Sequence, residues 1–333
     1  MKSDRWNDYA SSLVNTYGEP VYRIGIDGGF ACPNRQSDGS GGCAYCDETG
    51  SVAAYQRSKE RSLGTDFYQT IKSSPRCTGE NRQDIERRKI SILEQIRHGS
   101  AFLDRRYGQG GRSIYFQAFT STFGSAEVLK ELYDCALSTG TYREFIVSTR
   151  SDCLDSGIAD LLASYKKQVD EVWVELGLQT ANDSTLAALG RGETVDQFVR
   201  SCEIAQRSSL RCSAHVILGL PGESYEHIAR TAAILRQVKV DAVKIHNLHI
   251  VAGSRYFQEY EAGVLTAPSP QRHLDYTIYL LRRLSKDMMI QRFVSDTPRH
   301  RLAAPRDFGD KHTFVRTLMA TMKDRQVIQG DLV

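Results

Sequence analysis

The sequence contains no long apolar run. No segment approaches the roughly 18 consecutive apolar residues that a membrane-spanning helix requires. Its first ten residues, MKSDRWNDYA, also lack the apolar core of a signal peptide. These two absences exclude the membrane class, and they predict a protein that is located in the cytoplasm and has no membrane partner.

A large charge of one sign is missing as well. Lys and Arg number 43 against 40 Asp and Glu, so the net charge of +3 neither requires nor excludes a nucleic-acid partner. The chain has 333 residues, of which 41% are hydrophobic and 25% are charged, as in ordinary globular proteins. We find no internal repeat of the solenoid type. Disordered, collagen-like and small secreted proteins are therefore excluded, and the chain is long enough to bury a sizeable core.

Cysteine is the first residue type that points to chemistry. The sequence has eight cysteines, at positions 32, 43, 46, 77, 135, 153, 202 and 212. In a reducing compartment, such cysteines bind metal or take part in catalysis more often than they form disulfides. Cys135 and Cys202 lie in helix-like segments and are predicted to be small core residues. Cys32, Cys43 and Cys46 lie together in a glycine-rich segment and are the candidate metal ligands.

Strand-like and helix-like segments alternate along most of the chain. The strand-like segments are residues 21–27, 113–119, 144–149, 171–180, 211–220 and 241–250. The helix-like segments that follow the first five of them are residues 89–107, 126–137, 158–167, 195–207 and 225–238. This alternation predicts a parallel sheet with helical crossovers, either a doubly wound sheet or a barrel.

Polar residues interrupt three of the strand-like segments. Glu175 and Gln179 share one alternating face of the fourth segment, His215 lies on the fifth, and Lys244 and His246 share a face of the sixth. A strand of a purely structural parallel sheet is apolar on both faces, and a buried carboxylate is costly without a partner. The pattern therefore favours a barrel with a cavity inside. His215, Lys244 and His246 are the candidate catalytic residues, although a strand histidine can equally be a hydrogen-bonded core group.

The alternation ends near residue 265. Beyond it we expect two helices and a short strand, at residues 271–287, 311–325 and 290–295 respectively. Residues 47–88 have few periodic apolar positions and predict an insertion or lid. The predicted organisation is a core barrel followed by a C-terminal α/β extension, residues 1–265 and 266–333.

The three clustered cysteines form a C-x10-C-x2-C motif directly after the first strand-like segment. A zinc site usually takes four ligands in two close pairs, whereas this motif offers one pair and a single cysteine. Three thiolates can instead hold an iron–sulfur cubane and leave one iron open for a ligand with amino and carboxylate groups. The alternatives are a zinc site completed from elsewhere in the chain and three unrelated structural cysteines.

Seven segments of the sequence resemble the radical S-adenosylmethionine (radical SAM) superfamily. They are CPNR, GGCAYC, YFQAFTSTF, STRSDCL, VWVELGLQT, HVILGLPGE and VKIHNLHIVAG. Within the superfamily the sequence resembles the YhcC/YtqA-like family, which is close to the radical domain of the Elongator catalytic subunit. The resemblance covers roughly residues 15–265. It implies a partial (βα)6 TIM-like barrel, in agreement with the six strand-like segments counted above.

The resemblance also implies the cofactors. A [4Fe-4S] cluster would be bound by Cys32, Cys43 and Cys46, with S-adenosylmethionine beside it. An electron donor such as flavodoxin or ferredoxin would reduce the cluster. The 5′-deoxyadenosyl radical released from S-adenosylmethionine would then abstract a hydrogen atom from the substrate, while the protein supplies placement and exclusion of water.

Several further residues are implied to bind S-adenosylmethionine. They are Tyr45, Gln117, Ser148, Thr149, Glu175, Gln179, Arg191 and Gly219. Structural roles stay open for the last two, because Arg191 could be a solvated charge and Gly219 part of a plain tight turn. The sequence departs from the superfamily pattern where QAFTST replaces a Gly-Gly-Glu-like edge, so only backbone contacts are expected there. It also departs in the length of residues 47–88 and in lacking a tryptophan after Ala304-Pro305.

For the substrate, the likeness to the Elongator radical domain implies tRNA and the C5 side chain of a wobble uridine. Residues 82–112 contain eight Lys or Arg against four acids, and residues 299–306 read RHRLAAPR. Such segments could bind phosphates or could simply be solvated faces. A protein, lipid or small metabolite is the alternative substrate, and a non-enzymatic zinc- or RNA-binding protein is the alternative of another class. The oligomeric state is not predicted.

Overall fold

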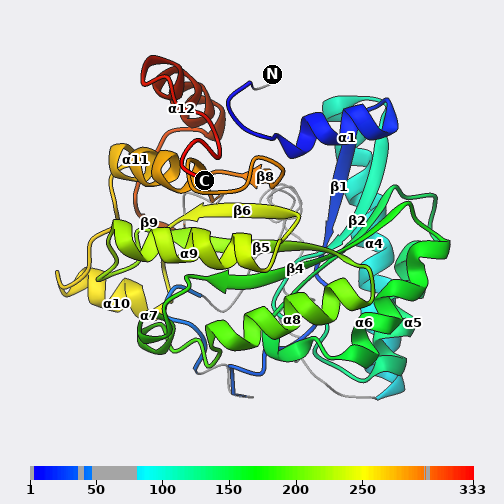
Figure 1. The fold of residues 1–333 in the computed structure, drawn as a ribbon. Coiled ribbons are helices and arrows are strands. Elements are labelled where there is room, and N and C mark those ends of the chain that lie inside the picture. Colours follow the sequence, from blue (N-terminus) through cyan, green and yellow to red (C-terminus); the bar gives the residue numbers. More distant parts are fainter. Residues whose placement is uncertain (1–3, 37–40, 47–80, 296, 298–300) are drawn as a thin grey trace.

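The computed structural model describes residues 4–36, 41–46, 81–295, 297 and 301–333. Within these residues, seven parallel strands form one sheet in the order β1-β2-β3-β4-β5-β6-β8. The strands are β1 (Val21–Ile26), β2 (Gly111–Phe116), β3 (Glu144–Thr149), β4 (Glu171–Gln179), β5 (Arg211–Leu218), β6 (Ala242–Asn247) and β8 (Met289–Arg292). The sheet is strongly curved and forms part of a barrel (Figure 1).

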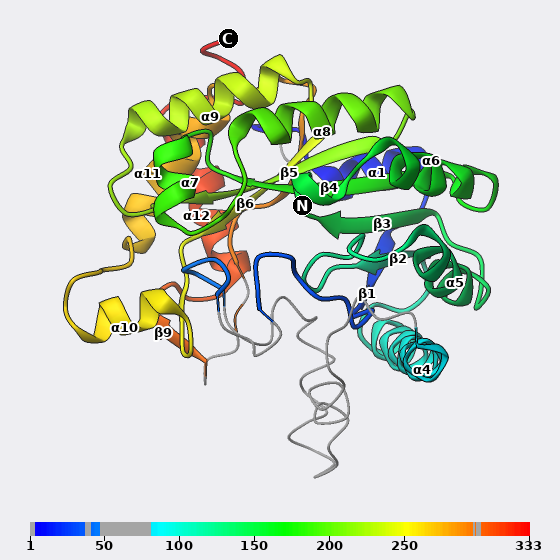
Figure 2. The same ribbon diagram turned by 90° about the horizontal axis from the view of Figure 1, so that it is seen from below.

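Helices cover the outer face of the sheet and lie in an arc around it when seen from below (Figure 2). They are α4 (Arg82–Tyr107), α5 (Ala126–Leu137), α6 (Ser156–Ser164), α8 (Val195–Arg207), α9 (Tyr225–Gln237) and α11 (Pro270–Leu281). The main apolar core lies between them and the sheet. In it, the ring of Tyr133 on α5 packs edge-to-face against Phe116 and Phe145, at centroid distances of 5.1 Å each. The predicted partial barrel of alternating strands and helices is confirmed.

Some elements have the bounds that the sequence predicts. These are α5, β3 and α8. The start of α8 shows why, because Thr194 and Gln197 form a capping box in which each side chain accepts a hydrogen bond from the other residue's backbone. Cys202 on α8 is fully buried, as expected, whereas Cys135 on α5 is only partly buried.

The first crossover helix differs from its prediction. Helix α4 begins at Arg82, seven residues before the predicted start, and Asn81 caps it by accepting a hydrogen bond from the backbone of Gln83. Its first two turns are mostly polar, so apolar periodicity does not reveal them. Residues 82–88 of the predicted insertion are therefore helical, and residues 47–80 lie outside the described part of the chain.

Helix α1 (Tyr9–Tyr17), which the sequence analysis does not anticipate, fills the amino end of the barrel. Tyr9 and Leu13 pack there in a buried cluster with Tyr115 and Trp173, and the rings of Tyr9 and Trp173 meet edge-to-face. The Tyr9 hydroxyl donates to the Glu144 carboxylate at 2.7 Å. This end of the barrel is therefore a packed core, which leaves the carboxyl end for chemistry.

A small antiparallel ribbon stands at the carboxyl end. It joins β7 (Ile250–Val251) to β9 (Leu302–Ala304). A second apolar cluster lies beside it and brings together Ala44 of the cysteine loop, Leu189, Ile217 and Tyr256. Helices α7 (Asp183–Ala188) and α10 (Arg255–Glu261) contribute to this cluster. The cysteine loop is thus packed against segments that are far away in the sequence.

The C-terminal residues continue the core sheet. Strand β8 lies within the predicted segment 290–295 apart from its first residue and pairs in parallel with β6. The two helices predicted in this region are α11, which ends at Leu281, and α12 (Lys311–Asp324). The boundary predicted at residue 265 stays a prediction. Among the described residues, no helix is both long enough and apolar enough to cross a membrane.

Candidate active site

A cavity of about 330 Å³ opens at the carboxyl edge of the sheet. The three clustered cysteines line it together with residues from the ends of β2, β3, β4, β5 and β6 and from the segment after β8. Parallel strands gather their carboxyl ends at one edge, which is where barrel enzymes build their sites. The cysteine motif and the polar strand residues, which the sequence shows as separate signals, therefore meet in one place.

The cysteine loop has a defined local structure. The backbone N–H of Arg35 donates to the Cys32 carbonyl at 3.0 Å, and that of Gly42 donates to the Asn34 carbonyl at 2.7 Å. Gly41 and Gly42 have φ angles of 77° and 87°, in the left-handed region that favours glycine. These two glycines of the motif therefore allow the loop to turn back tightly.

Backbone hydrogen bonds fix the middle of the motif. The N–H of Ala44 donates to the Leu189 carbonyl at 2.8 Å, and the Ala44 carbonyl accepts from the N–H of Tyr256 at 3.0 Å. Cys43 precedes this anchored residue, and the N–H of Cys46 donates to the Cys43 carbonyl at 2.9 Å. Backbone hydrogen bonds therefore fix the positions of Cys43 and Cys46.

The three thiols share one environment. Burial raises the pKa of Cys46, Arg35 opposes this rise, and the nearby Cys43 and Cys32 add to it. No set of three or more His, Cys, Asp or Glu side chains in the described part of the chain converges as ligands of a single metal ion. All three thiols line the same cavity.

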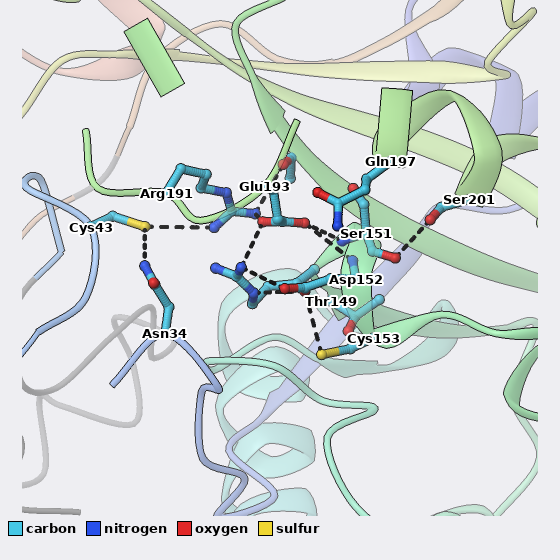
Figure 3. A network of polar contacts seen from close by, with 12 residues as sticks. Asn34, Cys43, Thr149, Ser151, Asp152, Cys153, Arg191, Glu193, Gln197 and Ser201 are labelled. Atoms are coloured by element: carbon cyan, nitrogen blue, oxygen red, sulfur yellow. Dashed lines mark hydrogen bonds and ion pairs between the residues drawn. The ribbon is translucent and has the colours of Figure 1, made fainter. Parts of the chain in front are cut away.

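Two side chains donate to the Cys43 sulfur, as Figure 3 shows. The Asn34 amide lies 3.5 Å from this sulfur, and the Arg191 Nη1 lies 3.7 Å from it. Arg191 also donates through Nη2 to the carbonyl of Gly177 on β4 at 2.9 Å. Since only 6% of Arg191 is exposed, this residue is not a solvated charge.

Glu193 holds Arg191 in place (Figure 3). Its Oε2 lies 2.6 Å from Arg191 Nη2 and 3.3 Å from Arg150 Nη2. Its Oε1 accepts from the backbone N–H of Ser151 at 2.6 Å and of Asp152 at 3.3 Å. Glu193, in the loop after α7, therefore links this loop to the turn after β3 and supports the arginine that contacts Cys43. Sequence analysis missed Arg150, which lies within the STRSDCL segment, and Glu193, which lies two residues after Arg191.

Glu175 is fully buried below the cavity and does not line it. Its carboxylate lies 2.5 Å from Lys244 Nζ, 3.0 Å from Arg23 Nη1 and 2.9 Å from His215 Nε2. Lys244 also donates to the Tyr115 hydroxyl at 3.0 Å. The polar strand face predicted from sequence is therefore an ion-pair network in which Arg23, unnoticed in the first strand-like segment, is a principal partner.

Burial and charge shift the pKa values of this network. Burial alone would raise the pKa of Glu175, but Lys244, Arg23 and His215 outweigh it and hold the pKa well below its usual range. Burial lowers the pKa of Lys244 to about 7, with Arg23 and Arg292 acting in the same direction against Glu175. Burial and Lys244 lower the pKa of His215 to about 4, so this imidazole is neutral at physiological pH.

Most of the predicted site residues line the same cavity. They are Cys32, Cys43, Cys46, Tyr45, Gln117, Ser148, Thr149, Gln179, Arg191, His215, Lys244 and His246. Glu175 and Gly219 do not line it. Gly219 has a φ of 87°, and a Cβ there would lie 2.2 Å from Pro268, so its geometry serves close packing of the turn. The structure brings the predicted residues together, and their individual roles stay predictions.

Two cavity residues have unusual backbone conformations. Gln179 and Phe119 have φ angles of 69° and 56°, which are uncommon outside glycine. Gln179 follows an irregularity in the pairing of β4 with β5, where the register shifts between Gly177 and Gln179. A bulge at a strand end re-aims the side chain, and strained residues of this kind cluster at functional sites. Both residues line the cavity, so these two unusual conformations occur at the candidate site.

Comparison with known proteins places the chain in a family. The family model of the radical SAM superfamily matches residues 31–235, and that of the Radical_SAM C-terminal domain matches residues 240–324. The protein YhcC of Escherichia coli is 33% identical over 305 residues, which cover 90% of this chain and 86% of YhcC.

Two more distant similarities concern the fold and a shorter segment. The solved structure of Elp3 from Methanocaldococcus infernus superposes with a TM-score of 0.61 at 17% identity, covering 72% of this chain and 60% of that one. A tRNA uridine(34) acetyltransferase of Methanocaldococcus jannaschii is 24% identical over 128 residues, or 38% of this chain and 24% of that protein. The superposition confirms the partial barrel fold. Since the superfamily model spans more than half of the sequence and YhcC matches almost all of it, the chain belongs to the radical SAM superfamily.

Proposed function

We propose that this radical SAM superfamily enzyme holds a [4Fe-4S] cluster on Cys32, Cys43 and Cys46, binds S-adenosylmethionine beside it and modifies tRNA, at the side chain of a wobble uridine. The observation that carries the proposal is the meeting of the three thiols with the polar strand ends in one cavity. When bound, the two cofactors supply one-electron chemistry that removes a hydrogen atom from the substrate, after reduction by a donor such as flavodoxin or ferredoxin.

The donor set fits a cluster better than a single metal ion. A zinc ion draws its sulfur ligands to about 2.3 Å from one point, whereas a cubane presents a separate iron to each of three thiolates. The three thiols line one cavity, and the motif offers three sulfur ligands, one fewer than a structural zinc site usually takes. Asn34 and Arg191 point hydrogen-bond donors at Cys43, and hydrogen bonds to the sulfurs are one of the ways in which proteins set the potential of a cluster.

Unpaired buried polar atoms on the adjacent wall support a bound cofactor. Thr120 Oγ1, Arg150 Nη1 and Arg191 Nε are buried and have no hydrogen-bond partner among the described residues. All three residues line the cavity. Because buried polar groups in native proteins are nearly always paired, these atoms indicate a polar ligand. The amino, carboxylate and ribose groups of S-adenosylmethionine would provide partners for them, beside Ser148 and Gln179.

We expect Gln179→Ala to weaken binding of S-adenosylmethionine to the cluster-loaded protein by roughly 5- to 150-fold, the usual cost of one buried hydrogen bond to a ligand. Gln179 lines the cavity and is held there by a strained backbone. Equilibrium binding checks this, with Gln258→Ala on the exposed side of α10 as the matched control. Unchanged affinity in Gln179→Ala would remove this residue from the cofactor site.

The buried network would help to place the substrate. Glu175 and the Tyr115 hydroxyl fix Lys244 in the cavity wall, and Glu175 also orients His215. His246 lies next to His215, with ring centroids 5.3 Å apart. Since these groups are held rigidly on strands, they can orient a substrate and keep water away from the reacting atoms.

The tRNA part of the proposal is supported by similarity. The M. jannaschii relative is named for tRNA uridine 34, and the fold likeness to Elp3 agrees with the predicted Elongator resemblance. The basic segment 82–112 gives less support than its composition suggests. Arg82, Arg87, Lys89 and Arg112 each pair with a carboxylate, and the Arg88 guanidinium donates to the Gly28 carbonyl.

Arg306, which is exposed after β9, is a better candidate for a phosphate contact. Arg299 of the same basic segment lies outside the described residues. Each phosphate contact releases counterions, so Arg306→Glu should weaken tRNA binding and reduce the salt slope by about one unit. Binding titrations at several salt concentrations check this, with Arg200→Glu on the exposed face of α8 as the control.

The substrate itself is tested by nucleoside mass spectrometry of tRNA from a strain that lacks the gene. A missing or truncated uridine modification supports the proposal. An unchanged nucleoside profile, together with tRNA binding that does not depend on salt, would contradict tRNA as the substrate. Reductive cleavage of S-adenosylmethionine to 5′-deoxyadenosine by the purified protein tests the radical chemistry separately.

A further inference from the structure

The cavity wall formed by β6 and β8 carries polar groups that neither the cysteines nor the predicted cofactor residues use. His246 and Asn247 end β6, and Arg292 ends β8. All three line the cavity. In the order of the sheet, β6 and β8 lie furthest from β1, the strand that precedes the cysteine loop. These groups therefore come from other strands than the one that leads into the cysteine loop.

The lining of the cavity is strongly cationic. It contains five arginines and one lysine, and no Asp or Glu occurs among the described lining residues. Arg35 and Arg191 stand beside the cysteines. The exposed side chain of Arg292 makes no hydrogen bond or ion pair with any residue of the described chain. Its charge is felt by Lys244 and His246, whose pKa values burial lowers first and Arg292 lowers further.

Two polar atoms on this wall are buried and unpaired. His246 Nε2 and Asn247 Nδ2 have no hydrogen-bond partner among the described residues. The other ends of both side chains are fixed, because His246 Nδ1 lies 3.1 Å from Ser295 Oγ and Asn247 Oδ1 accepts from the Ser295 N–H at 2.8 Å. Only 3% of Asn247 is exposed. Such atoms are rarely left without a partner, so they indicate a ligand group at this position.

Strand pairing brings the cationic groups together. The register of β6 and β8 shifts between Val243 and Lys244, and Lys244 then lies opposite Arg292. Glu175, the carboxylate that Lys244 contacts, is already shared with Arg23. The wall therefore has more positive charge than counter-charge, which favours an anion in the cavity.

We propose that His246, Asn247 and Arg292 anchor an anionic group of the substrate, a phosphate or a carboxylate. Arginine matches both groups through parallel N–H donors, and the Asn247 amide supplies a further donor. The inference rests on the proposed function, because the anchored molecule is the one on which the radical chemistry acts. In a nucleic acid the anion would be a phosphate next to a nucleotide turned into the cavity.

Equilibrium dialysis of the full-length, cluster-loaded protein with labelled inorganic phosphate and, separately, labelled acetate tests the anchor. S-adenosylmethionine is kept at saturation, so that its own carboxylate site is filled. We expect the wild-type protein to bind at least one of the two probes. Arg292→Gln should weaken this binding by about 10- to 100-fold, as expected for a charged hydrogen-bonding partner, and Arg292→Lys should recover part of it. Arg200→Gln, at an exposed arginine of α8 outside the cavity, is the matched control.

The outcomes separate the two sources of the anion. Binding of phosphate alone, lost in Arg292→Gln, identifies a phosphate group, and binding of acetate alone identifies a carboxylate. Absence of binding of both probes, or equal weakening by Arg200→Gln, would overturn the anchor. Failure of the wild-type protein to cleave S-adenosylmethionine, with Arg292-dependent anion binding intact, would instead overturn the proposed function.

Discussion

Replacing Cys43 with alanine should leave the purified protein colourless and without iron. Each of the three cysteines would supply one of only three protein bonds to the cluster, so the loss of any one should empty the site. Cys43 also receives the hydrogen bonds of Asn34 and Arg191. Iron and sulfide content and visible absorbance after anaerobic reconstitution measure the effect, and formation of 5′-deoxyadenosine should be abolished with it.

Cys135→Ala is the matched control for this experiment, because Cys135 lies on α5, away from the cavity. Cys32→Ala and Cys46→Ala should behave like Cys43→Ala. Full retention of iron in Cys43→Ala, or loss of iron in Cys135→Ala, would contradict the ligand assignment. Stoichiometric zinc in the wild-type protein, purified without oxygen, would favour the non-enzymatic zinc-binding alternative.

Replacing Glu175 with alanine should lower the free energy of unfolding by about 3–5 kcal/mol, the range expected when one partner of a buried ion pair is removed. Arg23 and Lys244 would both lose their shared carboxylate, and Lys244 would stay buried without a counter-charge. Denaturant titration measures the change. Glu226→Ala on α9 is the control, since Glu226 and Arg230 form an exposed pair that should contribute less than about 1 kcal/mol.

A double variant tests the electrostatic cause. Adding Lys244→Met to Glu175→Ala removes one of the two stranded cations, and Arg23 keeps Glu144 nearby as a counter-charge. The double variant should therefore be more stable than Glu175→Ala alone. If it is less stable by the sum of both single changes, the destabilisation comes from lost packing and not from unpaired charge.

The same carboxylate makes stability depend on pH. The folded state holds the pKa of Glu175 below its ordinary value of 4.5, so the unfolded chain binds more protons at low pH. The stabilisation is present above about pH 4.5 and is lost as the pH falls through the folded pKa. Glu175→Gln should lack this part of the acid dependence.

Patterns local in the sequence predicted most of the fold. Alternating strand-like and helix-like segments identified the six core strands, and the capping box at Thr194 and Gln197 shows why α8 begins where apolar periodicity suggests. Helix α1 and the two short strands of the β7–β9 ribbon were missed. Such short elements carry little periodicity of their own, and contacts with distant parts of the chain stabilise them.

The residues of the candidate site were likewise predicted where their pattern is local in the sequence, and missed where distant strands bring them together. The cysteine spacing is local, so the sequence could identify the three thiols as a group. Glu175 was predicted to contact the cofactor because the family resemblance implies such contacts on the fourth strand, and this role stays a prediction. Its actual neighbours include Arg23, which lies 152 positions away in the sequence. Only the register of the six strands from β1 to β6 brings Arg23, Glu175 and Lys244 together, and no local pattern reveals such a pairing.

The β7–β9 ribbon has a consequence for building chimaeras from related enzymes. Residues 250 and 304 pair in this ribbon. The chain after β8 therefore returns to the carboxyl end of the barrel and is hydrogen-bonded to it there. Arg301, which lines the cavity, belongs to this returning segment, and Arg292, which also lines it, ends β8 just before the segment. A chimaera that exchanged the C-terminal residues would therefore also exchange part of the cavity lining. We expect its substrate selectivity to follow the exchanged residues.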